Sequence, residues 1–237
     1  KEAIQDGDSI YAVIRGSAVN HDGHSVGISA PNPLAQAELI SKALERARVK
    51  ADEISYIEAH GTGTRLGDPI EIEGIRKAFA NKTDKKQDCA IGSVKSNIGH
   101  LDGAAGIAGL IKAILCLKNH EIAPSLFYKN PNKNIDFKNS PVYVCDHLQE
   151  WKNKQPTRKC GVSSFGFSGT NCHVILEEYK EDTQKDEERK ICKDNKSIFV
   201  LSALEQPALL QMIQNYVNLL EHTDIGSLQD ICYTVGI

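Results

Sequence analysis

The chain has 237 residues, of which 41% are hydrophobic and 25% are charged, and its formal net charge is −3. This is the composition of an ordinary globular protein with room for one sizeable core and part of a second unit. The basic residues are scattered, so no nucleic-acid partner is expected, and no apolar run reaches the roughly 18–20 residues of a membrane-spanning helix.

The seven cysteines are widely spaced and include no CxxC pair. This usage indicates reduced thiols and a cytoplasmic location rather than a disulfide framework. The eight histidines show no metal-ligand spacing, so no metal site is expected. The chain begins with Lys1 and shows no signal peptide, and we expect it to be a piece of a longer protein.

Strands and helices are predicted to alternate along the first half of the chain, because the hydrophobic periodicity switches repeatedly between the two types. In chain order these are a strand over 9–19, a polar Gly-rich loop over 20–33, a helix from Pro33, a strand over 54–59, a helix from Asp68, a strand over 89–94 and a helix over 103–118.

Capping signals predict where two of these helices begin. Asp68 is expected to cap its helix, with Pro69 at the first helical position and Glu71 at the third, in a pattern like a capping box. Asp102 is expected to cap the helix over 103–118. The small apolar residues of that helix predict burial against neighbouring backbone.

The second half of the chain is predicted to complete a sheet. Residues 119–158 are expected to be irregular apart from one strand over 142–145, and further strands are predicted over 161–165 and 172–177. The order of elements predicts an α/β fold in which helices pack against a mixed sheet.

A charge-dense stretch over 179–196 is predicted to be a linker. It separates a main unit over 1–178 from a tail over 197–237. In the tail a strand is predicted over 198–203 and an amphipathic helix over 207–222, and the last residues begin another helix. The tail is therefore expected to be a partial small α/β subdomain.

Two histidines follow predicted strands in glycine-rich turns. His60 begins the motif HGTGT and His100 ends the motif KSNIGH. With Lys95 they are expected to form a site that transfers protons and binds an oxyanion, and Thr62 and Thr64 add hydroxyls suited to a polar ligand arm. The alternative is an ordinary pair of tight turns that need glycine, with histidine filling space.

His100 precedes the amino end of a predicted helix, where the helix dipole is positive, and Lys95 adds a further positive charge. Both disfavour the imidazolium and are expected to keep His100 neutral near pH 7. A neutral imidazole can donate its N–H to a developing oxyanion.

Three longer motifs follow one another along the chain. They are HGTGT followed by LGDPIE, KSNIGH followed by the helix of small residues, and GVSSFGFSGTNCHVILEE. Together they resemble the β-ketoacyl synthase domain of type I polyketide synthases, over about residues 9–178. The tail resembles the α/β flanking subdomain of modular synthases. The resemblance implies a thiolase-like layered fold, of which this chain is the carboxyl-terminal half.

In that family a cysteine holds the acyl chain as a thioester. A malonyl-type extender on an acyl carrier protein loses CO₂ and attacks this thioester in a Claisen condensation. The resemblance implies that His60 and His100 assist decarboxylation and stabilise the enolate oxygen, and that Lys95 supports the site electrostatically. No cofactor is expected to bind directly, because the phosphopantetheine of the carrier protein holds the substrates.

The resemblance also implies roles in substrate binding. Thr62 and Thr64 match residues that contact the phosphopantetheine arm. Phe165 and Phe167 match an aromatic gate beside the nucleophile, and Asn171 matches a residue that braces the loop of the gate. Ordinary core packing is the alternative interpretation of the two phenylalanines.

The nucleophile motif of the family, a DTACSSS-like turn, is absent from this sequence. Cys172 lies nearest to a functional loop, but it begins a predicted strand and matches a non-catalytic position. We therefore expect the chain to be inactive alone. Its expected partners are the amino-terminal half of the ketosynthase and an acyl carrier protein, and the full-length enzyme is expected to be a homodimer.

The expected function is condensation by an elongating polyketide ketosynthase. The alternatives are a non-elongating ketosynthase that acts as an acyl relay or scaffold, a fatty-acid synthase ketosynthase, and a fragment that docks through the tail. Loss of the first histidine usually marks non-elongating modules, so the presence of His60 favours elongation. The VNHDG loop and the tail favour a polyketide synthase.

Overall fold

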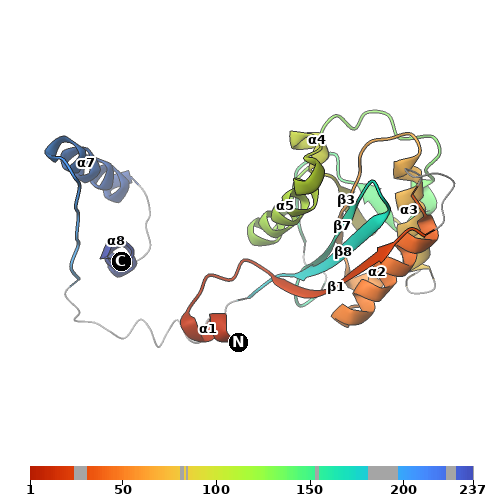
Figure 1. Cartoon of the computed structure of the whole chain (residues 1–237), viewed down its shortest axis with the longest axis horizontal. Helices are drawn as coiled ribbons and strands as arrows, with labels where there is room; N and C mark the ends of the chain where they lie inside the picture. The colour runs from red at the N-terminus through yellow and green to blue at the C-terminus, as the bar shows by residue number, and fades with distance from the viewer. Residues whose placement is uncertain are drawn as a thin grey trace. The chain divides into compact units, whose positions relative to one another are not determined.

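The computed structural model describes residues 1–23, 31–80, 83, 85–152, 155–180, 197–222 and 228–236. The chain divides into two compact units, 1–180 and 181–237 (Figure 1). Residues 24–30 of the predicted loop and 181–196 of the predicted linker lie outside the described residues. Within those residues no helix is long and apolar enough to cross a membrane.

The first unit contains a six-stranded sheet, a two-stranded sheet and helices. The strands of the large sheet are β1 (Val13–His21), β2 (Tyr56–Glu58), β3 (Cys89–Gly92), β5 (Val142–Val144), β7 (Lys159–Phe165) and β8 (Thr170–Glu177), and those of the small sheet are β4 (Glu121–Ile122) and β6 (Gln149–Glu150). The α-helices are α1 (Glu2–Asp6), α2 (Pro33–Ala47), α3 (Gly67–Phe79), α4 (Lys95–Ile98) and α5 (Ala105–Asn119), and the 3₁₀ turns are η1 (Ala51–Glu53), η2 (Asp102–Ala104) and η3 (Phe137–Asn139).

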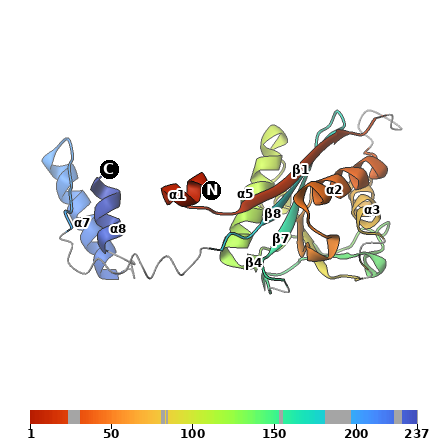
Figure 2. The same cartoon turned by 90° about the horizontal axis from the view of Figure 1, so that it is seen from below.

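The large sheet is mixed, as the order of predicted elements indicates. Its strand order is β1-β8-β7-β2-β3-β5. The pairs β1–β8 and β7–β8 are antiparallel, whereas β7–β2, β2–β3 and β3–β5 are parallel. Helices α2 and α3 cover one face of this sheet and α5 covers the other (Figures 1 and 2).

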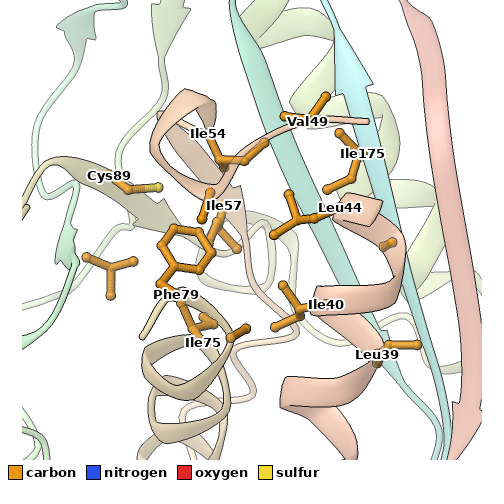
Figure 3. Packing of buried hydrophobic residues seen from close by; sticks show 14 of the residues in the cluster. Leu39, Ile40, Leu44, Val49, Ile54, Ile57, Ile75, Phe79, Cys89 and Ile175 are labelled. Atoms are coloured by element: carbon orange, nitrogen blue, oxygen red, sulfur yellow. The ribbon is translucent and has the colours of Figure 1, made fainter. Parts of the chain in front are cut away.

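The core under α2 and α3 is aliphatic. Helix α2 begins where the Asn32 side chain accepts the N–H groups of Leu34 and Ala35, at 3.0 and 3.4 Å. Its inward stripe packs against α3 and the sheet (Figure 3). The buried members shown there include Leu39, Ile40, Leu44, Ile57, Ile75, Phe79 and Ile175. Burying each such side chain contributes about 1.5–3 kcal/mol, so this face supplies much of the stability of the unit.

The core under α5 is built around two aromatic rings. Trp151 is 2% exposed, and its ring meets that of Tyr56 edge-on, with 5.7 Å between the centroids. The indole Nε1–H donates to Ser55 Oγ at 2.8 Å. Ala113 and Leu117 of α5 complete this layer. The central strands β2, β3 and β7 are therefore buried on both faces, as parallel strands covered by helices usually are.

The predicted capping by Asp68 is wrong. Helix α3 begins at Gly67, two residues before the predicted first position Pro69, and Leu66 at its N-cap provides no side-chain cap. The Gly67 N–H donates to Thr64 Oγ1 at 3.0 Å, and Asp68 Oδ1 accepts the N–H of Gly63 at 3.1 Å. Because the Thr64 hydroxyl already accepts an N–H at the start of the helix, the Asp68 carboxylate instead holds the preceding turn.

The predicted capping by Asp102 is also wrong. Asp102 lies in η2, between His100 and α5, and the N-cap of α5 is Ala104, which has no side-chain cap. Asp102 has a φ of 47°, and its side chain is fully exposed. An N-cap residue normally has an extended backbone, which directs its side chain toward the first amides of the helix. The backbone of Asp102 is left-handed instead, and its carboxylate does not cap α5.

Only one side of α5 is packed as predicted. Gly106 and Gly109 bring the helix close to Ser164 and Glu58. A Cβ at Gly106 would lie 3.0 Å from Ser164 Oγ, and a Cβ at Gly109 would lie 3.1 Å from Glu58 Cγ. On the other side Ile107, Ile111 and Leu115 are 54%, 51% and 49% exposed. These three residues are spaced four apart and share a face of the helix, so they point away from the sheet that the glycines contact.

The second unit contains α7 (Gln206–His222) and α8 (Leu228–Gly236) among its described residues. The strand predicted over 198–203 is not formed. A strand needs a neighbour to accept and donate its backbone hydrogen bonds, and the described part of this unit contains none. Phe199 instead packs edge-on against Tyr216 of α7, with 5.2 Å between the ring centroids. The described residues of the tail are thus helical rather than α/β.

Gly161→Ala should destabilise the first unit by about 1–3 kcal/mol, as overpacking does. A Cβ at Gly161 would lie 2.7 Å from Nε2 of His173, a fully buried imidazole held by Ser163. Gly103→Ala is the matched control, because a Cβ there meets nothing within 4 Å. Urea denaturation of the two variants checks this, and equal midpoints would contradict it.

Candidate active site

The two histidine-bearing turns begin at the same edge of the sheet. Strands β2 and β3 are parallel, with Glu58 opposite Gly92 at the end of the ladder. The chain leaves β2 into the HGTGT turn and leaves β3 into α4 and His100. As a result the rings of His60 and His100 lie with centroids 5.6 Å apart and planes at 83°. The structure brings together the two histidines that the motifs singled out.

His60 is half-buried between two aromatic neighbours. Its ring centroid lies 5.5 Å from that of Phe165, and the Phe165 N–H donates to His60 Nδ1 at 3.4 Å. Nδ1 is therefore an acceptor, and in the neutral ring Nε2 carries the proton. Burial, and then the charges of Lys95 and His100, lower the pKa of His60 to about 4. This imidazole is neutral at physiological pH and can donate a hydrogen bond through Nε2.

His100 is held by the backbone of η2. The N–H of Asp102 donates to His100 Nδ1 at 2.9 Å. This bond assigns the proton of the neutral ring to Nε2, as in His60. The 3₁₀ turn η2 separates His100 from the amino end of α5. The ring of His100 therefore accepts one backbone N–H from this turn, and does not lie directly at the first turn of α5 as the sequence suggested. The neutral state expected for His100 stays a prediction.

Lys95 is half-buried at the first position of α4. Burial lowers the pKa of its ammonium below the usual value, while the carboxylates of Glu71 and Glu58 act in the opposite direction. The positive charge of Lys95 in turn contributes to the low pKa of His60. Lys95 therefore lies close enough to the site to affect it electrostatically.

Glu71 is a site residue that the sequence pattern assigned to a capping box. It is 5% exposed, and its Oε1 and Oε2 accept the N–H groups of His60 and Gly61 at 2.8 and 2.9 Å. Burial raises its pKa to about 7, although the two hydrogen bonds oppose the shift. With Asp68 on Gly63, two carboxylates of α3 hold the HGTGT turn. The sequence feature that could have indicated this role is the position of Glu71, an acidic residue, on the buried face of α3 together with Ile72 and Ile75.

The two threonines of the HGTGT turn differ in their surroundings. Their Oγ1 atoms lie 3.4 Å apart, with Thr62 half-buried and Thr64 exposed. The Thr64 hydroxyl also accepts the N–H of Gly67 at the start of α3. Gly61 and Gly63 have φ values of 42° and 73°, which explains why this turn needs glycine.

The remaining predicted residues lie around the turn between β7 and β8. Phe165, at the end of β7, is brought against His60, whereas Phe167 is 78% exposed. Asn171 is buried, and its Nδ2 donates to Asp22 Oδ1 at 2.8 Å and Asn20 Oδ1 at 3.3 Å. Asn171 therefore ties the start of β8 to the end of β1.

A cavity of about 540 Å³ lies on the other side of the HGTGT turn. Its lining includes Gly61, Asp68, Glu71, Ser93 and Phe127. Glu71 thus both holds the HGTGT turn and contributes to the lining of this cavity. Among the described residues no group of three His, Cys, Asp or Glu side chains is arranged to hold a metal ion.

The ring protons of His60 should titrate with a midpoint near 4 in NMR spectra. The unfolded chain binds this proton more tightly than the folded protein, so the free energy of unfolding should fall as the pH decreases from about 6.5 toward 4. Lys95→Met removes a nearby positive charge and should move the midpoint of His60 upward. Lys77→Met, on the exposed face of α3, should leave it unchanged. A midpoint near 6.5 in the unmodified protein would contradict the effect of burial.

Comparison with protein families finds two matches along the chain. Residues 11–129 match the family described as β-ketoacyl synthase, C-terminal domain. Residues 131–236 match the ketoacyl-synthetase C-terminal extension. Both histidine-bearing turns fall within the first match.

The chain is similar to several curated polyketide synthases. The chain is 46% identical over 247 residues to polyketide synthase PksL of Bacillus subtilis (strain 168), an alignment that covers 100% of the chain and 5% of PksL. It is 41% identical over 224 residues to the highly reducing polyketide synthase Preu1 of Preussia isomera, covering 91% of the chain and 9% of Preu1. The chain spans a small part of these relatives.

Solved ketosynthases share the fold. The ketosynthase from module 6 of the bacillaene synthase of Bacillus subtilis 168 superimposes with a TM-score of 0.84 at 40% identity, over 99% of this chain and 40% of that one. The oxazolomycin ketosynthase domain OzmH KS7 of Streptomyces albus JA3453 gives a TM-score of 0.86 at 36% identity, over 99% and 41%. These matches confirm the expected thiolase-like fold. The chain belongs to the β-ketoacyl synthase family, as a carboxyl-terminal part of a ketosynthase of the type found in type I polyketide synthases.

Proposed function

We propose that this chain supplies the two histidines and the lysine of a polyketide ketosynthase that performs decarboxylative Claisen condensation. The observation that carries the proposal is the edge-to-face pair of His60 and His100, with ring centroids 5.6 Å apart. Two neutral rings that each present an Nε2–H can donate to one oxygen atom between them. That is the arrangement needed to stabilise an enolate.

The proposed reaction uses a malonyl-type extender on the phosphopantetheine of an acyl carrier protein. The C–C bond to the carboxylate breaks and CO₂ leaves, and the electron pair is delocalised onto the thioester oxygen, which accepts hydrogen bonds from His60 and His100. The enolate carbon then attacks the acyl thioester of the enzyme. The new C–C bond forms as the C–S bond breaks, and a cysteine thiolate is released.

Lys95 has a supporting role in this proposal. Its charge disfavours protonation of His60 and so keeps that ring a neutral donor. Thr62, Thr64, Phe165, Phe167 and Asn171 are proposed to bind the pantetheine arm and shape the entrance to the site.

The nucleophile is proposed to come from another part of the ketosynthase. Burial raises the pKa of the thiols of Cys116, Cys145, Cys160 and Cys172, which makes each a poor nucleophile. We further propose that residues 1–178 act as part of the condensing domain and 197–237 as part of its flanking subdomain, in a homodimer of the full-length enzyme.

A non-elongating relay is the second candidate function, since such a domain could hold the same fold. The contact of His60 with His100 and Phe165 favours elongation, because a relay has no use for a pair of donors at an enolate oxygen. The curated relatives described above are polyketide synthases, which favours that class over fatty-acid synthesis.

His60→Ala and His100→Ala should each slow release of CO₂ from a malonyl carrier protein by about 10²–10⁴-fold, because each removes a donor to the enolate oxygen. The assay uses a ketosynthase that carries this chain as its carboxyl-terminal part. His147→Ala is the control, since this histidine is exposed and pairs with Asp146. Wild-type rates in both active-site variants would exclude the mechanism.

A relay is distinguished by its products. With an acyl-loaded ketosynthase and malonyl carrier protein, an elongating enzyme should yield a β-ketoacyl carrier protein, detected by mass spectrometry. Transfer of the unextended acyl chain, without CO₂ release, would instead identify a relay.

A further inference from the structure

A buried charged cluster lies where β2 leads into the turn that carries His60. It consists of Tyr56 and Glu58 on β2 and Lys112 on α5. Glu58 is 1% exposed and the Lys112 side chain 10% exposed. Charges so far from water destabilise a protein unless they are paired, and the proposed reaction uses none of the three groups. We therefore ask which structural role these buried charges have.

Every oxygen of the Glu58 carboxylate has a partner. Oε1 accepts the N–H of Val94 at 2.6 Å. Oε2 accepts the hydroxyl of Tyr56 and lies 3.0 Å from Lys112 Nζ. The lysine contributes as a charge rather than as a well-directed hydrogen-bond donor. Burial and the adjacent carboxylate raise the pKa of Tyr56 well above its usual range, so its hydroxyl remains a donor.

Two glycines provide the space for this cluster. A Cβ at Gly92 would lie 3.0 Å from the Tyr56 hydroxyl, and a Cβ at Gly109 would lie 3.1 Å from Glu58 Cγ. Strand β3 therefore lies close to the Tyr56 hydroxyl, and helix α5 lies close to the Glu58 side chain. This packing, together with the partners of both oxygens, restricts the position of the carboxylate.

The hydrogen bond to Val94 connects the two turns beyond the end of the β2–β3 ladder. Glu58 lies two residues before His60, and Val94 lies at the N-cap of α4, one residue before Lys95. The ladder itself ends at Glu58 and Gly92. The side chain of Glu58 thus continues the connection from β2 to the segment that leads to His100.

We propose that Glu58, oriented by Lys112 and Tyr56, is a positioning residue that sets the separation of the His60 and His100 rings. Its effect on catalysis rests on the function proposed above, whereas its effect on geometry does not. The hydrogen bond to Val94 is the essential contact, and the ion pair with Lys112 keeps the carboxylate in place to make it.

Two double variants separate the hydrogen bond from the charge pair. Glu58→Met with Lys112→Met removes both charges and leaves the Val94 N–H without its acceptor. Glu58→Gln with Lys112→Met also removes both charges, but the amide can accept from Val94 and donate to Tyr56. Neither variant leaves an unpaired buried charge, which alone would destabilise the fold. Glu73→Gln, which removes an exposed ion pair of α3, is the control.

The variants are made in a ketosynthase that carries this chain, and their crystal structures and kinetics are measured. In the Met/Met variant the ring centroids should move by about 1 Å from the wild-type 5.6 Å, and kcat for CO₂ release should fall about 100-fold with little change in KM. The Gln/Met variant should keep the wild-type separation and remain within about fivefold of the wild-type rate. A structural role alone would affect both variants equally.

An unchanged ring separation in a folded Met/Met variant would overturn the proposal, whatever its rate. A changed separation with wild-type kcat would overturn the catalytic role and leave the geometric one. If the Met/Met variant does not fold, Val94→Pro removes the same N–H at a φ of −59°, which proline adopts. The same displacement is expected, and its absence would equally overturn the proposal. Wild-type activity in His60→Ala would instead refute the proposed function, and the crystallographic distances would still test Glu58.

Discussion

The parallel register of β2 and β3 is the constraint on which the site depends. In a parallel pair the carboxyl ends of both strands lie at one edge, so two turns whose histidines are 40 residues apart in the sequence begin side by side. That edge brings His60 and His100 into contact. Helices α2 and α3 on one face and α5 on the other bury the strands and keep the register in place.

Buried carboxylates hold the loops that the register brings together. Glu71 accepts two N–H groups of the HGTGT turn, and Glu58 accepts the N–H of Val94 before α4. A buried acceptor with a fixed side chain holds a backbone segment more strictly than an exposed one, because water cannot replace it. The loops at the site are therefore connected to the core through buried acidic side chains, although most of that core is aliphatic.

In both histidines Nδ1 accepts a backbone N–H, but the two rings have different neighbours. His60 is half-buried against Phe165, and burial together with the charge of Lys95 lowers its pKa to about 4. His100 accepts a backbone N–H from the 3₁₀ turn that follows it. In both rings Nδ1 is the acceptor, so Nε2 is the atom that carries the proton. The two rings can thus present equivalent Nε2–H donors although their surroundings differ.

The sequence by itself determined the order of strands and helices, the family and the two histidine motifs, because periodicity and glycine-rich motifs are local properties of the chain. It did not determine what the polar groups of α3 and η2 bind. Glu71 and Asp102 match capping patterns, yet one holds the HGTGT turn and the other contacts His100 through its backbone. It also did not predict that residues 198–203 form no strand. Only the tertiary structure decided these points, since hydrogen-bond partners distant in sequence compete with local ones and strands need neighbours.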